Sequence, residues 1–413
     1  MGDIIIIGAG LAGLTCARRL HAAGVSCVVF EAGDAVGGRV RTDILEGFRL
    51  DRGFQVFLTA YPTARAWLNY EPLQLQVFAA GSRVHCDGAM YEVSDPWREP
   101  KAVWATLRAP VGSLADKVRI ATLRRSARRG SLDQLWARPE TTALAALRAH
   151  GFSERMIERF LRPWFGGIFL DRELETSSRM LEFVFRMFAE GHAALPTAGM
   201  QAIPEQLAAG LPNGTVRLGA RVARLEKGAL FLESGERVAA SHTVVATENA
   251  GAAALLPEVA VSRWRATTTI YFAMGQSPLG APKLVLNGEG RGYVNNLVVL
   301  SDVAPSYAPA GQALVAVSVL GDPAIEQRAL VELVREELRA WFGAQVTAWR
   351  WLRSYRLPRA LPARMPLVPM HSVEVRPGVW IAGDGRSSAS IQGAMESGEA
   401  VATAILRQIE CMS

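Results

Sequence analysis

The chain has 413 residues, of which 50% are hydrophobic and 20% charged, and its formal net charge is +6 at pH 7. This composition excludes a disordered chain and predicts a globular protein of two domains, and no uncharged apolar run is long enough to span a bilayer. The four cysteines form no CxxC pair and the six histidines show no HxxxH spacing, so we expect a cytoplasmic protein without disulfides or a metal site.

The first 31 residues predict a strand, a glycine-rich turn, a helix and a second strand. The strand Asp3–Ile7 leads into the turn from Gly8 to Gly13, and the strand Val25–Phe30 ends at Glu31. In such a unit the glycines permit a tight turn, close approach of a pyrophosphate to the backbone, and close packing of helix on strand. A carboxylate after the second strand accepts hydrogen bonds from ribose hydroxyls and disfavours a 2′-phosphate. The unit predicts FAD or NAD, and we expect no signal peptide before it.

The middle of the chain alternates between helical and strand patterns. Residues 95–192 predict helices interrupted by prolines. Val216–Leu225 and Val244–Thr247 are predicted strands, the second of which would extend the sheet of the N-terminal unit. From Thr267 to Ser318, β-branched and alternating runs predict an antiparallel sheet, and an Arg/Glu-patterned helix follows at Ala324–Trp341.

Further motifs lie far apart along the chain. Gly37–Arg39 and Asp51–Gln55 follow the N-terminal unit, while Gly383–Asp384 precedes Ile391–Ala394 near the C-terminus. Together with the N-terminal unit, from residue 3 to about residue 407, these motifs resemble the superfamily of flavin amine oxidases, protoporphyrinogen oxidases and carotene desaturases. Motifs separated by almost the whole chain rarely match together by chance.

The resemblance implies FAD as the cofactor, bound non-covalently because no cysteine or histidine stands beside the motifs. In the superfamily the arginine matched by Arg39 lies against the pyrophosphate, and the segment matched by Gly53 runs beneath the isoalloxazine ring. The aspartate matched by Asp384 meets the ribityl-pyrophosphate region, and the backbone of a valine, here Val222, contacts adenine. A helix start near Ala394 would suit the negative charge of a reduced flavin. The predicted cofactor-binding residues are Gly8, Gly10, Leu11, Ala12, Gly13, Glu31, Ala32, Gly37, Gly38, Arg39, Gly53, Phe54, Val222, Gly383, Asp384, Ile391, Gln392 and Ala394.

The resemblance also implies an α/β fold. An FAD-binding, Rossmann-like (two-dinucleotide-binding) domain would carry an inserted substrate domain made of a helical cap and an antiparallel sheet. We assign residues 1–90, 195–255 and 365–413 to the FAD-binding domain and residues 91–194 and 256–364 to the substrate domain. No second GxGxxG motif occurs in the chain, so we expect electrons to reach the flavin from an organic substrate.

Two features weigh against an amine substrate. Ser390 stands where flavin amine oxidases usually place an aromatic side chain, and no lysine for the floor of the site occurs between Lys227 and Lys283. The C-terminal motif and the aromatic-rich segment Phe160–Leu181 are similar to carotene desaturases, although aromatic residues at helical spacing also form ordinary cores. The resemblance favours hydride removal from an apolar, isoprenoid- or carotenoid-like substrate, with dioxygen or a quinone as acceptor. The alternatives are a protoporphyrinogen- or amine-type oxidase using dioxygen, and a non-enzymatic flavoprotein with structural FAD.

Arg52, Gln55 and Tyr271 are the candidate catalytic residues near the ring, and each can equally be a structural hydrogen-bonding residue. Residues 98–138 contain ten basic residues against three acids. This charge predicts peripheral association with an anionic membrane surface, and a solvated helix is the other interpretation. No nucleic-acid-binding module is recognisable.

Overall fold

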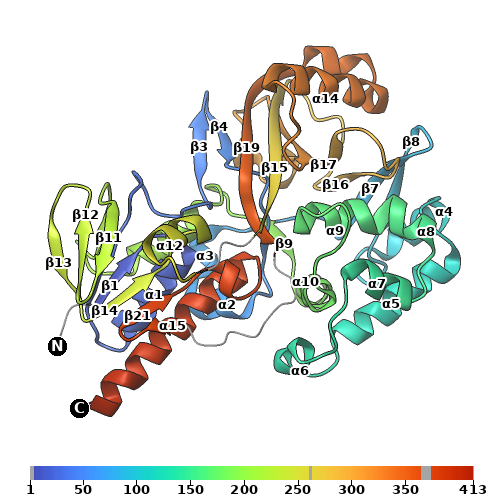
Figure 1. Ribbon diagram of the computed structural model, residues 1–413. Helices are drawn as coiled ribbons and strands as arrows, with labels where there is room; N and C mark the ends of the chain where they lie inside the picture. Colours follow the sequence, from blue (N-terminus) through green and yellow to red (C-terminus); the bar gives the residue numbers. More distant parts are fainter. Residues whose placement is uncertain (1–3, 260–262, 364–373, 413) are drawn as a thin grey trace.

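The predicted N-terminal unit forms the centre of a parallel sheet (Figure 1). The computed structural model describes residues 4–259, 263–363 and 374–412, so Asp3 of the predicted first strand lies outside it. β1 (Ile4–Ile7) pairs in parallel with β2 (Cys27–Phe30) on one side and with β14 (His242–Val245) on the other. All four isoleucines of β1 are buried, as expected for a strand covered on both faces. The predicted strand near residue 244 thus extends this sheet.

Stretches far apart in sequence complete the sheet. Its order is β10-β2-β1-β14-β21-β20, and only β20 runs antiparallel to its neighbour. The outer strands are β10 (Val216–Arg217), β21 (Val379–Ile381) and β20 (Glu374–Arg376). The first and last parts of the chain therefore share one sheet with its middle.

The single strand predicted at Val216–Leu225 is wrong. The structure divides it into β10 and β11 (Val222–Glu226), and β11 belongs to a separate three-stranded antiparallel sheet. The other strands of that sheet are β12 (Ala229–Leu232) and β13 (Arg237–Ala239). Between β10 and β11 the chain turns at Gly219, whose φ of 65° is a conformation that glycine adopts without strain.

A second large sheet has seven strands in the order β19-β15-β18-β17-β16-β7-β8, antiparallel except for the β16–β7 pair. Its strands are β7 (Gly81–Cys86), β8 (Ala89–Ser94), β15 (Arg263–Met274), β16 (Leu284–Asn287), β17 (Val294–Val299), β18 (Ala313–Leu320) and β19 (Arg350–Ala363). The antiparallel sheet predicted from Thr267 to Ser318 is confirmed. The helix predicted at Ala324–Trp341 is present as α14 (Gln327–Phe342), which packs on one face of the sheet.

Strands β7 and β8 belong to this second sheet, although the sequence analysis assigned residues 1–90 to the FAD-binding domain. β7 pairs with β16, and β8 pairs with β7. By sheet membership, the first FAD-binding segment therefore ends before Gly81. Residues 364–373 and 413, at the third predicted segment, lie outside the described residues. The division into domains stays a prediction.

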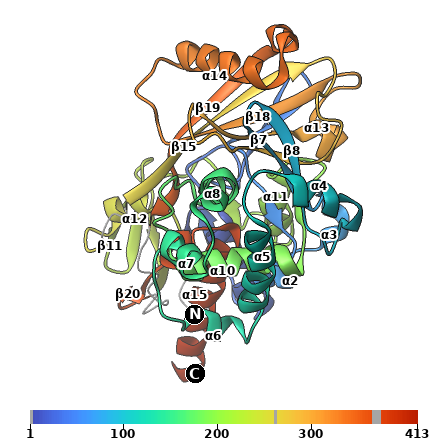
Figure 2. The same cartoon turned by 90° about the vertical axis from the view of Figure 1, so that its right-hand side faces the viewer.

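The helices predicted for residues 95–192 are confirmed and form a cap beside the seven-stranded sheet (Figure 2). They are the 3₁₀ turn η1 (Pro100–Ala102), α4 (Val103–Arg108), α5 (Leu114–Ala127), α6 (Leu132–Trp136), α7 (Ala143–Ala149), α8 (Glu154–Met156), the π-helical turn η2 (Ile157–Leu161), α9 (Arg162–Phe169) and α10 (Ser178–Glu190). α9 packs against the sheet, while α10 packs on α5 and α7. Among the described residues, no helix combines the length and apolar character needed to cross a bilayer.

Shorter elements connect the two sheets. They are β3 (Thr42–Leu45), β4 (Phe48–Asp51), β5 (Phe57–Leu58), α2 (Pro62–Trp67), α3 (Tyr70–Leu73), β6 (Gln76–Val77), β9 (Ala193–Leu195), α11 (Ala202–Ala209), α12 (Asn249–Leu255), α13 (Leu300–Val303), η3 (Pro305–Tyr307), η4 (Ala344–Ala348) and η5 (Asp384–Arg386). The helices of the FAD-binding motifs are α1 (Leu11–Ala22) and α15 (Ile391–Met412).

The aromatic residues of the cap are mostly core. Phe165 and Phe183 are fully buried in the hydrophobic cluster that also contains Tyr271 of β15. Trp164 and Phe188 are only half-buried, and their ring centroids lie 5.4 Å apart. The core interpretation therefore holds for most of the cap's aromatic residues, and an apolar substrate would have to contact the half-buried ones.

Helices α1 and α15 pack with their backbones in close approach. A Cβ atom added at Gly398 of α15 would lie 2.0 Å from the carbonyl oxygen of Ala12 in α1, which no side chain could accommodate without a shift of backbone. This contact positions the N-terminus of α1 relative to the C-terminal motif. Gly398 is therefore a packing residue of α15, four residues beyond the predicted motif Ile391–Ala394.

We predict that Gly398→Ala destabilises the protein by about 3 kcal/mol, at the upper end of the cost of overpacking a core. The measurement is the free energy of unfolding from urea denaturation. Gly275→Ala is the matched control, because a Cβ atom there meets nothing within 4 Å. Equal stability of the two variants would contradict the close approach of the helices.

Asp51 is a buried carboxylate that joins three parts of the chain without a cation beside it. It accepts hydrogen bonds from the Thr42 hydroxyl (2.6 Å), the Met200 backbone N–H (3.0 Å) and the Tyr307 hydroxyl (2.9 Å). Burial raises the pKa of Asp51 to about 6, because the hydrogen bonds offset only part of the cost of desolvating the charge. The protein therefore binds this proton more tightly when folded than when unfolded.

The raised pKa of Asp51 gives a pH-dependent stability with a definite sign. Its contribution to stability is complete below the pKa of the unfolded chain and is lost as the pH rises through 6. Relative to wild type, the unfolding free energy of Asp51→Asn should therefore rise by up to about 3 kcal/mol between pH 4 and pH 7. Asp116→Asn should change in the opposite direction below pH 4, because hydrogen bonds from Ser153 and Ser113 outweigh burial and lower the pKa of Asp116 to about 2. Parallel curves for all three proteins would contradict this account.

Candidate functional site

The glycine-rich turn leaves open space at one glycine only. A Cβ atom at Gly8, whose φ is 106°, would lie 2.9 Å from the Ala246 carbonyl oxygen, and one at Gly13 would lie 2.0 Å from the Gly8 carbonyl oxygen. At Gly10, the N-cap residue of α1, a Cβ atom would meet nothing within 4 Å. No side chain caps this helix end. Gly8 and Gly13 thus serve packing, while Gly10 borders an open helix N-terminus suited to an anion.

Glu31 closes the loop that follows β2. Its carboxylate accepts the backbone N–H of Ala9 and that of Gly33, both at 2.7 Å. Beside it, the Ala220 N–H donates to the Glu31 carbonyl oxygen, so the approach to β11 lies against this loop. Each carboxylate oxygen accepts more than one hydrogen bond, so the predicted ribose contact stays open. A structural role for Glu31 in the turn was missed by sequence reasoning.

The GGR motif lies directly against the glycine-rich turn. The Gly37 N–H donates to the Ala9 carbonyl oxygen at 2.8 Å, and a Cβ atom at Gly38 would lie 3.5 Å from the Cα atom of Gly10. The packing of Gly37 and Gly38 on the turn therefore places Arg39 beside the open N-terminus of α1. There its guanidinium group can pair with a pyrophosphate bound at the helix end.

Arg39 joins the N-terminal and C-terminal motifs. Its guanidinium group donates to Asp384 at 2.6 Å and to the carbonyl oxygen of Ala360 in β19, also at 2.6 Å. The same group lies 5.5 Å from the centre of the Trp264 ring of β15. The Nε1 atom of Trp264 is buried without a hydrogen-bond partner among the described residues. Ala360 and Trp264 had no signal in the sequence, because only tertiary pairing of β15 with β19 brings them here.

The C-terminal motif ends at the N-terminus of α15. The Gly383 N–H donates to the Ser397 hydroxyl at 2.8 Å, which ties the end of β21 to the helix. Ser390 is the N-cap of α15, because its hydroxyl accepts the Gly393 N–H at 3.0 Å. The Gln392 side chain exchanges hydrogen bonds with Thr63 of α2, which links the start of α15 to α2. Ser390 thus has a local role that the sequence analysis did not assign.

The D-x-G segment is held against the floor of the seven-stranded sheet. A Cβ atom at Gly53, whose φ is 94°, would lie 2.7 Å from a methyl group of Leu357 in β19. The Phe54 N–H donates to the Thr269 hydroxyl of β15 at 3.1 Å. Gln55 donates to the carbonyl oxygens of Arg39 and Arg52 at 2.9 and 3.2 Å. The predicted GGR and D-x-G motifs therefore do lie together, with Thr269 and Leu357 added by the fold.

The three candidate catalytic residues occupy different environments. Arg52 forms an ion pair with Asp43 at 2.9 Å and remains partly exposed, and Gln55 bridges two backbone carbonyls. Tyr271 is fully buried, and its hydroxyl donates to the Asp51 carbonyl oxygen at 2.7 Å. Burial raises the pKa of Tyr271 far above its ordinary value, which disfavours proton transfer at neutral pH. These contacts favour positioning roles, and a catalytic role for any of the three stays a prediction.

Four further residues predicted to bind the cofactor differ in how exposed they are. Leu11 and Ala12 are buried in the first turn of α1, so only their backbone N–H groups face outward. Ala32 is exposed, and Val222 is half-buried at the start of β11. The donor set fits a dinucleotide: it combines a helix N-terminus without a cap, the guanidinium group of Arg39 and the unpartnered Trp264 Nε1.

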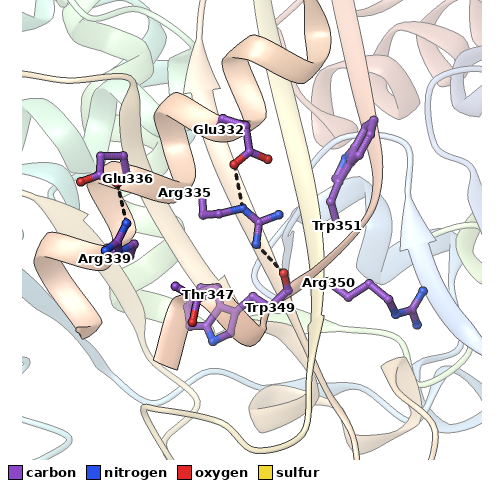
Figure 3. Close-up of a pocket in the computed structure, with 8 residues that line it drawn as sticks. All are labelled: Glu332, Arg335, Glu336, Arg339, Thr347, Trp349, Arg350 and Trp351. Carbon is purple, nitrogen blue, oxygen red and sulfur yellow. Dashed lines mark hydrogen bonds and ion pairs between the residues drawn. The ribbon is translucent and has the colours of Figure 1, made fainter. Parts of the chain in front are cut away.

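A cavity of about 530 Å³ lies elsewhere, between α14 and β19 (Figure 3). Its charged side chains are largely paired with one another, Arg335 with Glu332 at 3.3 Å and Arg339 with Glu336 at 3.0 Å. None of the motif residues lines it. It is therefore not a candidate for the flavin site, and its paired charges offer no obvious ligand chemistry.

Comparisons with known proteins agree with this site. Residues 11–406 match the family described as flavin containing amine oxidoreductase. The chain is 28% identical over 305 residues to a phytoene dehydrogenase of Streptomyces griseus, covering 67% of the chain and 56% of that protein. It is 27% identical over 286 residues to polyamine oxidase 1 of Oryza sativa subsp. japonica, covering 59% and 51%. A coproporphyrinogen III oxidase of Mycobacterium leprae is 26% identical over 213 residues, covering 50% and 44%. The chain spans about half the length of the curated relatives it matches.

Solved structures show the same fold. An oxidoreductase from Methanosarcina mazei superposes with a TM-score of 0.76 at 19% identity, covering 97% of this chain and 99% of that one. Cyclohexylamine oxidase from Brevibacterium oxydans gives a TM-score of 0.75 at 18% identity, covering 99% of both chains. The predicted α/β fold, the superfamily and the FAD cofactor are confirmed. The chain belongs to the flavin containing amine oxidoreductase family.

Proposed function

We propose that this oxidoreductase removes a hydride from an apolar, isoprenoid- or carotenoid-like substrate, as a desaturase does. The observation that carries the proposal is the residue at the start of α15. Ser390 is a small N-cap residue whose hydroxyl is used by the Gly393 N–H, and it offers no aromatic wall to hold an amine. The absence of a lysine from β15 supports the same substrate class. The named phytoene dehydrogenase among the relatives is consistent with it.

Bound FAD supplies a ring that accepts a hydride. The protein binds and orients the cofactor and the substrate and shields them from water. The open N-terminus of α1 presents N–H groups to phosphate oxygens, and Arg39 offsets their charge while Asp384 orients its guanidinium group. The Phe54 N–H bond to Thr269 holds the D-x-G backbone in place. The N-terminus of α15, capped by Ser390, contributes its dipole to the far end of the site.

The cap would keep water from the substrate. Trp164 is half-buried, with its ring 4.7 Å from Phe165 and 5.4 Å from Phe160. Phe160 and Phe165 are buried and support Trp164 from behind, so the half-buried rings of Trp164 and Phe188 would form the apolar surface for a long hydrocarbon. An apolar environment disfavours water near a carbon that is losing a hydride. No side chain with a clear role as proton acceptor stands among the described motif residues, so a bound water molecule would take the proton.

One alternative has specific support. Polyamine oxidase and coproporphyrinogen III oxidases are also among the relatives, so an oxidase that uses dioxygen is the second candidate. A non-enzymatic flavoprotein with structural FAD has no such support and is kept only as an outcome of the test. Anaerobic photoreduction followed by mixing with air or with a quinone separates them: an oxidase reoxidises rapidly in air, a desaturase prefers the quinone, and a structural flavin responds productively to neither.

An apolar substrate is held in lipid, so we propose peripheral association with a membrane surface for an otherwise cytoplasmic protein. The sequence analysis based this on the ten basic residues between 98 and 138. The structure pairs several of them with carboxylates, including Arg124 with Asp95 at 3.1 Å and Arg138 with Glu182 at 2.6 Å. Total charge in the stretch is therefore a poor measure of attraction, and exposed, unpaired cations matter more.

We predict that the purified protein is yellow and that Glu31→Ala releases FAD at least about tenfold more readily, because a charge-assisted hydrogen bond contributes about 1.5–3 kcal/mol. The measurement is FAD fluorescence in the dialysate. Glu233→Ala is the matched control, since Glu233 is an exposed acid paired with Arg221 outside the site. If Glu31→Ala loses FAD only in proportion to a lower unfolding temperature, its role is limited to ordering the turn.

We predict no peroxide release with benzylamine or spermine, and anaerobic bleaching of the flavin by acyclic polyenes. Ser390→Tyr should weaken polyene binding by adding bulk, but it also removes the cap of α15, at a cost of about 1 kcal/mol. Ser390→Ala removes the same cap without bulk and is therefore the matched control. Equal polyene affinity in the two variants would show that residue 390 does not face the substrate, and rapid amine turnover would favour the oxidase.

A further inference from the structure

Exposed apolar side chains gather on one part of the cap. Of the nine large hydrophobic residues that are exposed in the described chain, five lie between residues 97 and 118. They are Trp97, Trp104, Leu107, Leu114 and Val118. The most exposed are Trp104 (71%), Val118 (66%) and Leu114 (64%). A cluster of this kind marks an interaction surface, whereas the other four residues are scattered singly, as is normal for a soluble protein.

Helices α4 and α5 present these side chains together. Leu114 and Val118 are four residues apart and share a face of α5, while Trp104 and Leu107 are three apart on α4. The Lys117 ammonium group donates to the Leu107 and Ala109 carbonyl oxygens, at 2.7 and 3.1 Å. This contact holds the C-terminus of α4 against the first turn of α5. We call Trp104, Leu107, Leu114 and Val118 the α4–α5 face; both helices lie at the right-hand edge of Figure 1 and toward the viewer in Figure 2.

Hydrogen bonds and ion pairs anchor the buried side of α5 and the chain ahead of α4. The Asp116 carboxylate, fully buried, accepts hydrogen bonds from Ser113 and Ser153 at 2.7–2.8 Å. Ahead of α4, the Lys283 ammonium group pairs with Glu99 at 2.6 Å and with Glu92 at 2.9 Å. The apolar face is thus displayed by an ordered scaffold and is not a loosened part of the core.

Apart from Lys117, which bonds to backbone carbonyls, the cations of this region fall into two groups. Five arginines are paired with carboxylates of the fold, and these are Arg98, Arg119, Arg124, Arg128 and Arg138. Lys101, Arg108, Arg125 and Arg129 are exposed and form no ion pair among the described residues. Lys101 and Arg108 stand three before and four after Trp104. Arg125 stands seven after Val118, on the same side of α5. Free cations therefore flank the exposed apolar side chains.

We propose that the α4–α5 face docks on the surface of an anionic lipid bilayer. Unpaired Lys and Arg side chains attract anionic headgroups, tryptophan favours the headgroup level, and leucine and valine side chains enter the acyl boundary. An anionic bilayer matches both the exposed apolar side chains and the free cations beside them. A protein partner would need acidic side chains placed opposite each of these cations. The inference deepens the proposed function by naming the surface that would supply an apolar substrate. Only this link to the substrate rests on the proposed function, and the docking itself does not.

The test uses the full chain loaded with FAD and vesicles of phosphatidylcholine with or without phosphatidylglycerol. We expect flotation with the anionic vesicles at low salt, weaker binding as salt screens the cations, and poor binding to phosphatidylcholine alone. The double variant Trp104→Glu, Leu114→Glu should lower the bound fraction by at least about tenfold. Ile44→Glu, Leu333→Glu is the matched control, because it places the same charges at exposed apolar residues outside the face.

A second variant tests the cations. Lys101→Gln, Arg108→Gln, Arg125→Gln should abolish the preference for anionic vesicles. Its matched control neutralises three exposed basic residues elsewhere, Arg237, Arg328 and Arg407, and should keep that preference. FAD content and unfolding temperature, measured for every variant, must equal those of the wild type.

Three results would overturn the proposal: no flotation of the wild type at low salt, equal loss in a variant and its control, or self-association through the face without vesicle binding. The last would appear in light scattering as a dimer that Trp104→Glu, Leu114→Glu dissociates. Failure of the substrate class is separable, because flotation does not depend on turnover. Vesicle binding with no flavin bleaching by polyenes in detergent would retain the docking face and refute the apolar substrate.

Discussion

The contact between Arg39 and Asp384 is the constraint on which the flavin site depends. The two residues are 345 positions apart in the chain, yet their side chains meet at 2.6 Å. The guanidinium group also holds the Ala360 carbonyl oxygen of β19 and packs on Trp264 of β15. One side chain thus ties the glycine-rich turn, the C-terminal motif and the floor of the second sheet together. Removing Arg39 would leave the buried Asp384 carboxylate without its cation, which is costlier than losing a surface ion pair.

A second constraint acts beneath the D-x-G segment. Asp51 takes hydrogen bonds from Thr42, Met200 and Tyr307, while its backbone carbonyl oxygen accepts the Tyr271 hydroxyl. These contacts connect the β3–β4 hairpin, the chain before α11, the turn η3 and strand β15 of the seven-stranded sheet. A buried carboxylate without a cation is expensive, so the network of donors is what allows it. These hydrogen bonds therefore hold in place the D-x-G backbone, which would run beneath the flavin ring.

The cap has two sides with different chemistry. Its inner side contributes Phe165 and Phe183 to the core and leaves Trp164 half-buried. Its outer side carries the α4–α5 face, where apolar residues are displayed instead of hidden. An enzyme that draws an apolar molecule from lipid needs both properties: a surface that meets the bilayer and an interior that excludes water. The ion pairs and hydrogen bonds of Lys283 and Asp116 separate the two sides.

The sequence by itself determined the cofactor class and most of the elements. Short-range patterns were sufficient for β1, α1 and β2 and for the helical cap, because each rests on local periodicity and on turn chemistry at glycine or proline, whereas α15 followed from the resemblance of its motif to the superfamily. Local patterns were insufficient at Val216–Leu225, where a turn at Gly219 sends β10 and β11 into different sheets. They also missed that β7 pairs with β16, almost two hundred residues later, since strand partners are set by packing and not by propensity.

Within the site, sequence reasoning identified the residue types but not their partners. Three predicted residues have local structural roles that only the fold reveals. Glu31 accepts hydrogen bonds within the loop after β2, Ser390 caps α15, and Gln392 links α15 to α2. Thr269, Leu357 and Trp264 lie at the site with no motif to announce them, because the pairing of β15 with β19 alone brings them there. In the same way, the sequence shows ten basic residues between 98 and 138, but only the tertiary structure shows which of them lack a carboxylate partner among the described residues. A charge is neutralised by whichever carboxylate packs beside it, and that neighbour is fixed by the three-dimensional arrangement of distant segments.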